Sequence, residues 1–359
     1  MTAVECAQLT LGYPNVAPVL VGVDLRVAEG EVVALLGPSG SGKTTLIHAI
    51  AGFIVPTAGE ITLAGAVVST NRRFVPPERR NVGMVFQHYA LWPHMTALDT
   101  VAYPLRRAGL SRREARNRGR ELLDRVGVGA LADRKPAELS GGQQQRIGLA
   151  RALAREPAVH LFDEPSAHLD AHLRAAVIEE LARQRAASGA AALYATHDPT
   201  EALAVADRVA VLHSSRLVQV ATPDDVYAQP ADVTVARLTG PASLLAVPVR
   251  ADGPDAIAFT IGEATVTVPC ANATSGSSRD GDRTADPSLD PPSTVLIRPD
   301  WASLGGRFPG VVAAVRFHGP HTDHHLDTPA GALVVRAAGL PRVAVGDRVS
   351  WAPHRCWRL

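Results

Sequence analysis

One segment near the N-terminus constrains the fold more than any other, because an apolar stretch runs through a glycine-rich loop into a helix-like stretch. Residues 31–36 are the expected strand, and residues 45–50 are the expected helix. Glycines in such a loop let backbone N–H groups surround phosphate oxygens, and the helix N-terminus adds its dipole. The residues expected to hold phosphate are Gly37, Pro38, Ser39, Gly40, Ser41, Gly42, Lys43, Thr44 and Thr45. The segment predicts an α/β nucleotide-binding core.

Two side chains at the end of this loop predict its chemistry. Lys43 is expected to reach the β- and γ-phosphates, and the Thr44 hydroxyl is expected to bind Mg²⁺. A glycine-rich turn without a ligand is the alternative, and the strand and helix on either side argue against it. The loop alone leaves kinases, GTPases and many ATPases open.

Composition excludes several other classes of protein. Lys and Arg number 36 against 35 Asp and Glu, so the net charge of +1 predicts no general attraction to nucleic acid. The cysteines Cys6, Cys270 and Cys356 lie far apart in no metal-ligand spacing, which indicates a reducing compartment. We find no signal-peptide pattern and no apolar run near the roughly 20 residues that span a bilayer. Any membrane span is therefore expected on another chain.

The pattern along the chain predicts two domains, residues 1–240 and residues 241–359. Alternating strand-like and helix-like segments fill the first, interrupted by a helical subdomain at about 88–157. Short Val-rich runs between Gly and Pro predict a small antiparallel β domain in the second, with residues 246–268 as its first strands. The later runs are 294–298, 310–317, 332–337 and 348–351. A polar stretch, 271–293, predicts a disordered loop inside this domain.

A second candidate phosphate site lies at the start of another helix. Ser140 and Gln143 form a capping-box pattern that is expected to start a helix over Gln144–Arg155. Gly141 and Gly142 between them leave backbone N–H groups open to an anion. From the capping pattern alone, an ordinary capped helix is an equal alternative.

The segment Leu139–Arg146 resembles the signature sequence of the ABC ATPase family. In that family the signature of one subunit contacts the γ-phosphate of ATP held by the other subunit's phosphate loop. The resemblance therefore implies that Ser140, Gly141, Gly142 and Gln143 bind the partner's ATP. It also implies a homodimer, or a pair with a homologous ATPase, that closes over two ATP molecules.

The apolar run at residues 158–162 ends in two carboxylates, as does the second nucleotide motif of this family. Asp163 is expected in the Mg²⁺ shell, and Glu164 is expected to orient or deprotonate the attacking water. A strand ending in an acidic turn is the alternative. His160 departs from the usual aliphatic residue, and we interpret it as a core histidine with its hydrogen bonds satisfied rather than a catalytic group.

The resemblance assigns three further residues that would be ordinary on their own. Gln87 matches the glutamine that touches Mg²⁺ or the water and links the nucleotide to the helical subdomain. His197, after an apolar run at 191–196, matches the histidine that contacts the γ-phosphate and helps hold Glu164. Tyr13 matches an aromatic residue that stacks on adenine, although a single Tyr beside a Pro is also a common turn residue.

One motif departs from the family pattern. Asp170 is the expected D-loop aspartate, but Ala167 stands where relatives usually carry Ser. The missing hydroxyl either weakens communication between the two sites or is replaced by Ser166.

An arginine-rich stretch in the helical subdomain is interpreted as a solvated face, with contact to anionic headgroups as the alternative. Its members are Arg106, Arg107, Arg112, Arg113, Arg116, Arg118 and Arg120.

Residues 81–105 resemble the ATPase subunits of bacterial ABC importers for polyamines, iron(III), sulfate and oligosaccharides. Residues 297–299 and 345–349 resemble the OB-like TOBE domain that many of these subunits carry. The resemblance implies an ATPase that uses ATP and Mg²⁺ and lies peripherally on the cytoplasmic face of the cell membrane. It also implies transmembrane permease subunits and an extracytoplasmic solute-binding protein as partners, with no nucleic acid.

Two alternatives remain from other classes. A soluble ABC ATPase acting on nucleic acid or ribosomes commonly carries two cassettes or a long coiled coil, and this chain shows one cassette and no sustained heptads. An exporter subunit is the other alternative, and the importer-type C-terminal domain argues against it.

Overall fold

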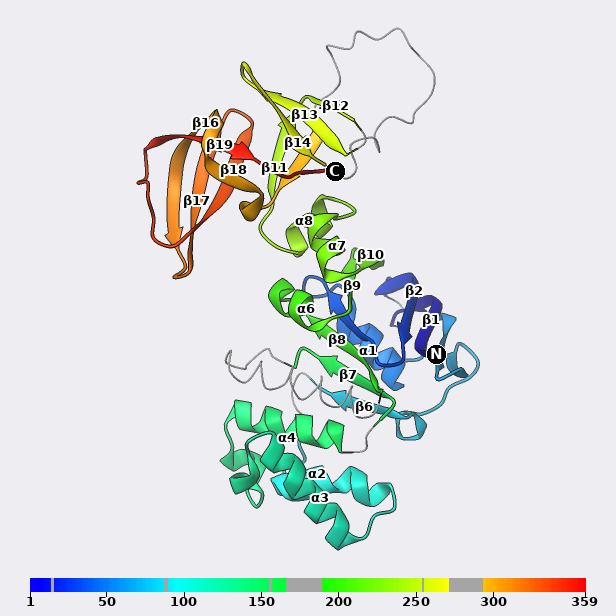
Figure 1. Ribbon diagram of the computed structural model, residues 1–359. Coiled ribbons are helices and arrows are strands. Elements are labelled where there is room, and N and C mark those ends of the chain that lie inside the picture. Colours follow the sequence, from blue (N-terminus) through cyan, green and yellow to red (C-terminus); the bar gives the residue numbers. More distant parts are fainter. Residues whose placement is uncertain (14–15, 87–89, 155–156, 166–188, 254, 271–292) are drawn as a thin grey trace. The chain divides into compact units, whose positions relative to one another are not determined.

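The computed structural model describes residues 1–13, 16–86, 90–154, 157–165, 189–253, 255–270 and 293–359. The chain forms two compact units, Met1–Asp224 and Asp225–Leu359 (Figure 1). None of the helices in the described ranges has both the length and the apolar content that a membrane crossing requires.

The N-terminal unit contains two sheets. The smaller is antiparallel with strand order β2-β1-β4-β5, and the larger has the order β10-β9-β3-β8-β7-β6. In the larger sheet β10 is antiparallel to β9, and the other neighbouring pairs are parallel. The smaller sheet consists of β1 (Thr2–Leu11), β2 (Leu20–Ala28), β4 (Ala58–Leu63) and β5 (Ala66–Thr70). The larger consists of β3 (Val32–Leu36), β6 (Val82–Val85), β7 (Val159–Asp163), β8 (Ala191–Thr196), β9 (Arg208–His213) and β10 (Arg216–Ala221).

The strands β3, β7 and β8 are buried along their whole length, which explains their continuous apolar sequences. Their side chains enter two apolar cores in alternation. Leu35 and Leu161 pack with the helix α1 and the smaller sheet. Phe162 and Tyr194 pack on the opposite face, in a core built with α2, α3 and α4. These cores fix the strands whose ends carry the candidate site.

The helical subdomain follows β6 and packs as a three-helix group. Figure 1 shows α2, α3 and α4 together beyond the β6 edge of the sheet. Thr96, Ser111 and Ser140 cap the three helices through their side-chain oxygens. The helices that the described residues of this unit form are α1 (Lys43–Ala51), α2 (Ala97–Arg107), α3 (Arg112–Arg125), α4 (Gly141–Leu153) and α6 (Pro199–Val205). Short 3₁₀ turns cover Pro77–Arg79, Gly129–Leu131 and Pro136–Glu138.

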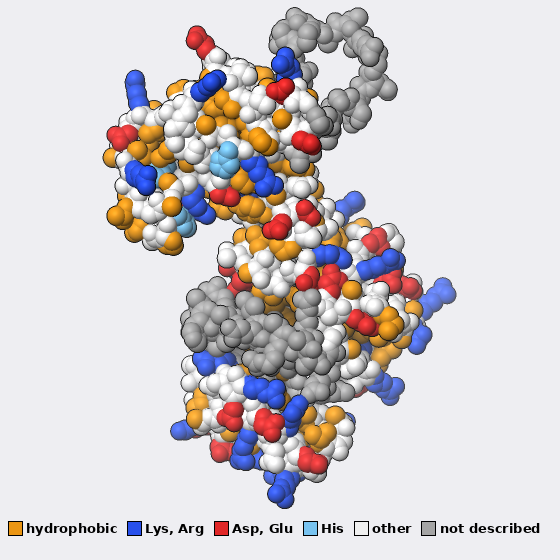
Figure 2. Space-filling model, in the orientation of Figure 1, with side chains coloured by type: hydrophobic (Ala, Val, Ile, Leu, Met, Phe, Trp, Pro, Cys, Tyr) orange, Lys and Arg blue, Asp and Glu red, His pale blue; other side chains and the backbone are white. Residues whose placement is uncertain are grey.

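The arginine-rich stretch lies on α2 and α3, and its charges are partly paired. Arg116 forms an ion pair with Asp99, and Arg118 lies 3.5 Å from Glu121. Figure 2 shows Lys and Arg side chains interspersed with Asp and Glu side chains over this part of the visible face. A mixed surface of this kind is the expected property of a solvated helix face.

The described residues of the C-terminal unit form three antiparallel sheets, with orders β11-β15-β20, β12-β13-β14 and β18-β17-β16-β19. Phe259, Phe308 and Trp351 form the centre of its core, with ring centroids 5.7 Å and 5.1 Å apart. The helical elements are α7 (Pro223–Ala228), α8 (Val233–Leu238) and a 3₁₀ turn at Pro299–Trp301. The first strands are β11 (Ser243–Val247), β12 (Val249–Ala251), β13 (Ala256–Ile261) and β14 (Ala264–Pro269). The later strands are β15 (Ser293–Ile297), β16 (Ala302–Phe317), β17 (His321–Thr328), β18 (Gly331–Ala338), β19 (Arg348–Pro353) and β20 (Trp357–Arg358).

Arg298 joins the segment with α7 and α8 to the C-terminal unit, which begins at Asp225. Its side chain is fully buried, and burial lowers the pKa of its guanidinium to about 10. It donates hydrogen bonds to the main-chain oxygens of Tyr227, Ala236, Gly240 and Pro241 and to the Thr239 hydroxyl. The segment with α7 and α8 is therefore held against the 3₁₀ turn of the C-terminal unit.

Strand β17 is a C-terminal element that the sequence analysis missed. Its sequence is almost entirely polar, yet Thr322, His324 and Leu326 alternate inward and are buried. The apolar alternation used to find strands is absent because two of these three inward positions are polar. The expected disordered loop, 271–293, falls outside the described residues except for Ser293, which begins β15.

Candidate active site

The carboxyl ends of three neighbouring parallel strands carry the candidate site. β3 leads into the glycine-rich loop, β7 ends at Asp163 with Glu164 next, and β8 leads to His197. β3 pairs with β8, and β8 pairs with β7. Groups from three distant parts of the sequence therefore meet at one edge of the sheet.

Two glycines of the loop are required by close packing. A Cβ at Gly37 would collide with the main-chain oxygen of Leu212 at the end of β9 and would lie 2.7 Å from Oγ of Ser41. Gly42 has a φ of 100°, and a Cβ there would lie 2.6 Å from Cδ2 of Leu20. The loop is thus fitted tightly between β9 and β2, and larger residues would displace it.

Lys43 is the first residue of α1, and its side chain is only 4% exposed. Its Nζ donates hydrogen bonds to the main-chain oxygens of Gly37 at 2.8 Å and Pro38 at 3.1 Å. Burial lowers the pKa of the Lys43 ammonium, while the charges of Glu164 and Asp163 act in the opposite direction. Nζ also lies 3.8 Å from Oε1 of Glu164, so a positive charge is held between the loop and the carboxylates.

Asp163 faces α1, and each of its oxygens meets a different residue of that helix. Thr44 donates a hydrogen bond from Oγ1 to Oδ1 at 2.8 Å, and Nε2 of His48 lies 3.7 Å from Oδ2. Burial raises the pKa of the Asp163 carboxyl, and the hydrogen bond from Thr44 opposes this. The sequence analysis did not identify His48. Its position four residues after Thr44, on the same helix face, was the available signal.

Glu164 has a φ of 47°, a backbone conformation that residues other than glycine rarely adopt. Its N–H donates to the main-chain oxygen of Ala195 on β8 at 3.1 Å, which holds this conformation in place. Oε2 of its carboxylate lies 3.4 Å from Nδ1 of His197, while Oε1 faces Lys43. The carboxylate is therefore held between the Lys43 ammonium and the His197 ring. Strained backbone of this kind is concentrated at functional sites.

The capping box at the start of α4 is confirmed. The N–H of Gln143 donates to Oγ of Ser140 at 3.4 Å, and the Ser140 N–H donates to Oε1 of Gln143 at 2.9 Å. The expected start at Gln144 is wrong, because the residue after the Ser140 cap, Gly141, is already helical. Ser140 and Gly141 are exposed, and a Cβ at Gly141 or Gly142 would meet nothing within 4 Å. The helix N-terminus is thus open to a ligand.

Two expected site residues, Gln87 and Asp170, lie outside the described residues, as does Ala167. A third, Tyr13, is described. Tyr13 is 52% exposed at the end of β1. Leu11 of that strand pairs with Leu20, whose side chain packs against the Gly42 position. Tyr13 therefore follows a strand that runs beside the loop, and about half of its surface is exposed.

His160 lies in the core, as expected, but its hydrogen bonds are not satisfied. Among the described residues neither ring nitrogen has a hydrogen-bond partner, although the side chain is only 3% exposed. The ring stacks on Phe162 with centroids 5.9 Å apart, and burial lowers the pKa of His160 to about 4. His160 is therefore an uncharged core residue. It is not the hydrogen-bonded histidine that was expected, and its unpaired ring nitrogens lower the stability of the fold.

The arrangement has the components needed to cleave a nucleoside triphosphate. It combines a loop of backbone N–H groups, a buried lysine, a threonine hydroxyl beside a carboxylate, and a second carboxylate held near the loop. Together with the parallel sheet, these features define an ATPase of the phosphate-loop class.

Comparison with known proteins identifies the family. The family model for ABC transporters matches residues 20–167, and that for the TOBE domain matches residues 295–359. The chain is 40% identical to the Fe(3+) ions import ATP-binding protein FbpC of Brucella abortus, over 93% of this chain and 92% of that protein. It is 36% identical to the spermidine/putrescine import ATP-binding protein PotA of Ruegeria pomeroyi, over 97% and 93%. The chain therefore belongs to the ABC transporter family and is an ABC ATPase with a TOBE domain.

Two further similarities cover the ATPase part. An sn-glycerol-3-phosphate import ATP-binding protein, UgpC of Rhodopseudomonas palustris, is 42% identical over 67% of this chain and 65% of that protein. A dimeric ATP-binding cassette in a post-hydrolysis state, bound to ADP and Pi, superposes with a TM-score of 0.57 at 32% identity. That structure covers 61% of this chain and 98% of its own. The cassette fold of the N-terminal unit is thus shared with a solved ATPase dimer.

Proposed function

We propose that this chain is the ATP-hydrolysing subunit of an importer, in which two copies bind two ATP molecules and drive separate membrane-spanning subunits. The observation that carries the proposal is the position of Glu164. Its carboxylate lies between Lys43 and His197, beside the pair formed by Thr44 and Asp163. This arrangement supports the proposal that Glu164 is the base, Lys43 a phosphate ligand, and Thr44 with Asp163 the metal-binding pair.

The loop residues 37–45 would hold the ATP phosphates through their backbone N–H groups. Lys43, now bonded to the loop carbonyls, would exchange those bonds for the β- and γ-phosphates. Tyr13 would stack on the adenine.

The Thr44 hydroxyl and the Asp163 carboxylate fit a magnesium ion, because Mg²⁺ prefers oxygen ligands and these two oxygens already lie 2.8 Å apart. Gln87 is proposed to be a further ligand of the same ion. Bound Mg²⁺ would neutralise charge that develops on the phosphates.

Glu164 would accept a proton from the attacking water as ATP is cleaved to ADP and phosphate. Its carboxylate is held by the Lys43 ammonium on one side and the His197 ring on the other, at 3.8 Å and 3.4 Å. His197 is 57% exposed on its side chain, so it can also reach a phosphate oxygen. The strained backbone of Glu164 and its bond to Ala195 keep the carboxylate at this position.

The N-terminus of α4 would complete the site of a second copy. Ser140, Gly141, Gly142 and Gln143 present an exposed helix end with open space around both glycines. A partner's γ-phosphate would accept hydrogen bonds from these N–H groups and gain from the helix dipole. Asp170 is proposed to lie at the same interface. The dimeric form of the similar solved cassette supports this assembly.

A groove in the N-terminal unit suits an apolar segment of a permease subunit. Its volume is about 590 Å³, and it lies between the β6 edge and the helices α2 and α4. Aromatic side chains line it, including Phe53, Phe86, Trp92 and Tyr103. A groove of this composition favours a helix with apolar anchors.

Docking to a permease subunit would hold the chain at the cytoplasmic face of the membrane. A solute-binding protein is proposed on the other side.

The cargo does not follow from this chain. The similar import proteins are named for Fe(3+) ions, for spermidine and putrescine, and for sn-glycerol-3-phosphate, at comparable identities. Cargo is therefore expected to be selected by the permease and binding protein.

Two variants test the proposed cycle. Glu164→Gln should bind ATP yet hydrolyse it at least about 100-fold more slowly, so that dimers accumulate in size-exclusion chromatography with ATP. Adding Ser140→Arg to Glu164→Gln should abolish these dimers while fluorescent ATP still binds each chain. Wild-type turnover by Glu164→Gln would remove it as the base, and dimers that persist with Ser140→Arg would remove the two-subunit site.

Membrane partnership needs a separate measurement. Affinity purification of the tagged chain from gently solubilised native membranes should recover multi-spanning subunits, identified by mass spectrometry. Recovery with ribosomal proteins or nucleic acid instead would contradict the transport role.

A further inference from the structure

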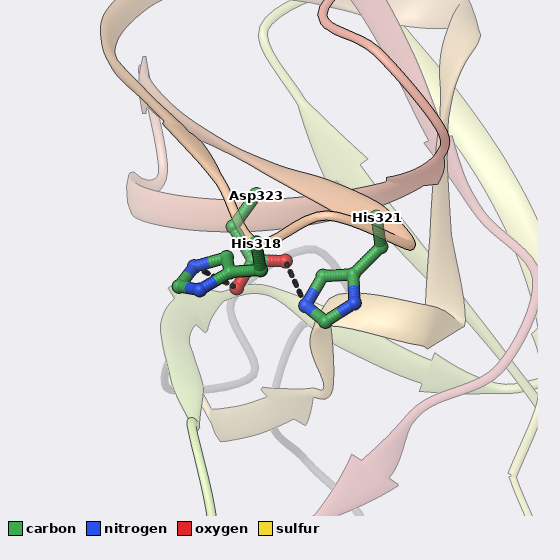
Figure 3. Close-up of side chains that lie close together, drawn as sticks. All are labelled: His318, His321 and Asp323. Carbon is green, nitrogen blue, oxygen red and sulfur yellow. Dashed lines mark ion pairs between the residues drawn. The ribbon is translucent and has the colours of Figure 1, made fainter.

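The hairpin that joins β16 to β17 brings two histidines beside a carboxylate. His321 begins β17, Asp323 lies two residues further on the same face, and His318 lies just before the turn. Nε2 of His318 is 3.7 Å from Oδ2 of Asp323, and Nε2 of His321 is 3.9 Å from Oδ1. Figure 3 shows both rings directed at the carboxylate, each toward its own oxygen.

The backbone of the turn holds the two rings together. The His318 N–H donates to the main-chain oxygen of His321 at 2.9 Å, which closes the hairpin. Gly319 has a φ of 86° and Pro320 follows it, so the turn needs these residue types. The rings stack with centroids 5.0 Å apart and planes inclined by 25°. Their proximity is therefore set by local backbone structure.

The spacing of the donor atoms is close to that of a metal site. One donor atom from each of the three residues lies within 4.8 Å of the others. Ligands about 2.0–2.1 Å from a tetrahedral zinc ion are separated from one another by about 3.4 Å. Side-chain exposures of 48% for His318 and 30% for His321 leave both rings free to rotate the remaining ångström or so.

Arg336 holds the third ligand in place. It donates hydrogen bonds from Nε and Nη2 to the two oxygens of Asp323, at 2.7 Å and 2.8 Å. Each carboxylate oxygen has a second lone pair, which remains available to a cation. Such an outer hydrogen-bond partner orients a metal-binding carboxylate.

Positive charge near the site limits its affinity. Arg336 lies on β18 and Arg316 on β16, and both pair across the sheet with Asp323. Either guanidinium repels a divalent cation. Binding is therefore expected to be weaker than at a closed structural zinc site.

We propose that His318, His321 and Asp323 form a binding site for a divalent transition-metal cation of the zinc type. Two imidazoles with one carboxylate suit zinc and its neighbours, whereas magnesium and calcium prefer all-oxygen ligands. Because His318 is exposed, a fourth position stays open to water or to a further ligand. The site belongs to the TOBE part of the chain and is additional to the nucleotide site.

The test is a Zn²⁺ titration of the full chain by isothermal calorimetry, without nucleotide and with excess Mg²⁺ to occupy oxygen-rich sites. Wild type should show one binding event that His318→Ala and His321→Ala each weaken at least about tenfold. His354→Ala is the matched control, because His354 is exposed and follows Pro353, which pairs with Ala302 at the far end of β16 from the hairpin. It should bind as wild type does.

A second readout uses Co²⁺ in place of Zn²⁺, since its weak visible absorption in water becomes much stronger in a four-coordinate site. This increase should be seen with wild type and be lost in the two ligand variants. Thermal unfolding without metal checks that the variants fold, and the corresponding glutamine variant, His318→Gln or His321→Gln, replaces an alanine variant that does not. Equal Zn²⁺ affinity in wild type, the His318 and His321 variants, and His354→Ala would overturn the proposal. So would the absence of a Zn²⁺ binding event in wild type in the presence of the excess Mg²⁺.

Discussion

Replacing Thr44 by valine tests how the loop and the carboxylate of Asp163 depend on each other. Thr44→Val keeps the branched shape but removes the hydroxyl that donates to Oδ1 of Asp163 at 2.8 Å. The matched control, Thr44→Ser, retains that hydroxyl. Asp163 is only 2% exposed, so water is a poor replacement for the lost donor.

A hydrogen bond to a charged group contributes about 1.5–3 kcal/mol. Thr44→Val should therefore lower the free energy of unfolding by about this amount relative to Thr44→Ser at pH 7. The kcat/KM of Thr44→Val for ATP should fall by about 10–150-fold relative to Thr44→Ser, because the same hydroxyl is the proposed magnesium ligand. Urea unfolding and a coupled ATPase assay measure the two effects.

The pH dependence gives the sharper check. Burial raises the pKa of the Asp163 carboxyl in the folded state. Above this pKa the buried carboxylate is ionised and lowers the free energy of unfolding. As the pH falls below this pKa, the carboxyl is protonated and the loss of stability disappears. Removing the Thr44 hydroxyl raises this pKa further. The difference between the two variants should be largest at neutral pH and shrink in acid. A difference that is absent at pH 7, or constant with pH, would refute the reasoning.

Three other changes follow from the described contacts. Gly37→Ala should lower ATPase activity about 100-fold because its Cβ collides with the main-chain oxygen of Leu212 and shifts the loop, whereas Gly310→Ala, whose Cβ would make only ordinary contacts at 3.5 Å or more, should retain it. Arg298→Met should lower the free energy of unfolding by at least about 3 kcal/mol in urea, since several buried carbonyls lose their donor; a loss under about 1 kcal/mol would contradict this. His160→Leu should lose less stability than wild type from pH 6.5 to about 4, where the unfolded histidine takes up a proton first; equal slopes would count against it.

The residues around the phosphate loop were predictable because their signals are local. The loop, its strand and its helix are contiguous, and a fully buried strand ending in two carboxylates is visible as an apolar run before Asp163 and Glu164. The capping box at Ser140 is likewise a pattern of four residues. The family resemblance supplied the order that connects these segments.

The features that escaped prediction depend on partners distant in sequence or on polar residues. His48 gains significance only because β7 brings Asp163 to α1. Strand β17 has no apolar alternation, so its pairing with β16 and β18 decides its structure. The spacing of His318, His321 and Asp323 around a Gly-Pro turn was a usable signal that the search for metal ligands among cysteines passed over.

The order of strands in the larger sheet has a consequence for synthesis on the ribosome. β3 pairs with β8 and β9, and their translation is completed roughly 160 to 180 residues after that of β3. At about 5–20 residues per second, the strand that leads into the phosphate loop waits about 8–36 s for its neighbours. During that time an entirely apolar strand has no partner on either edge, so the nascent chain is exposed to aggregation until residues 191–213 emerge. The phosphate loop therefore acquires its final support only late in translation of the N-terminal unit.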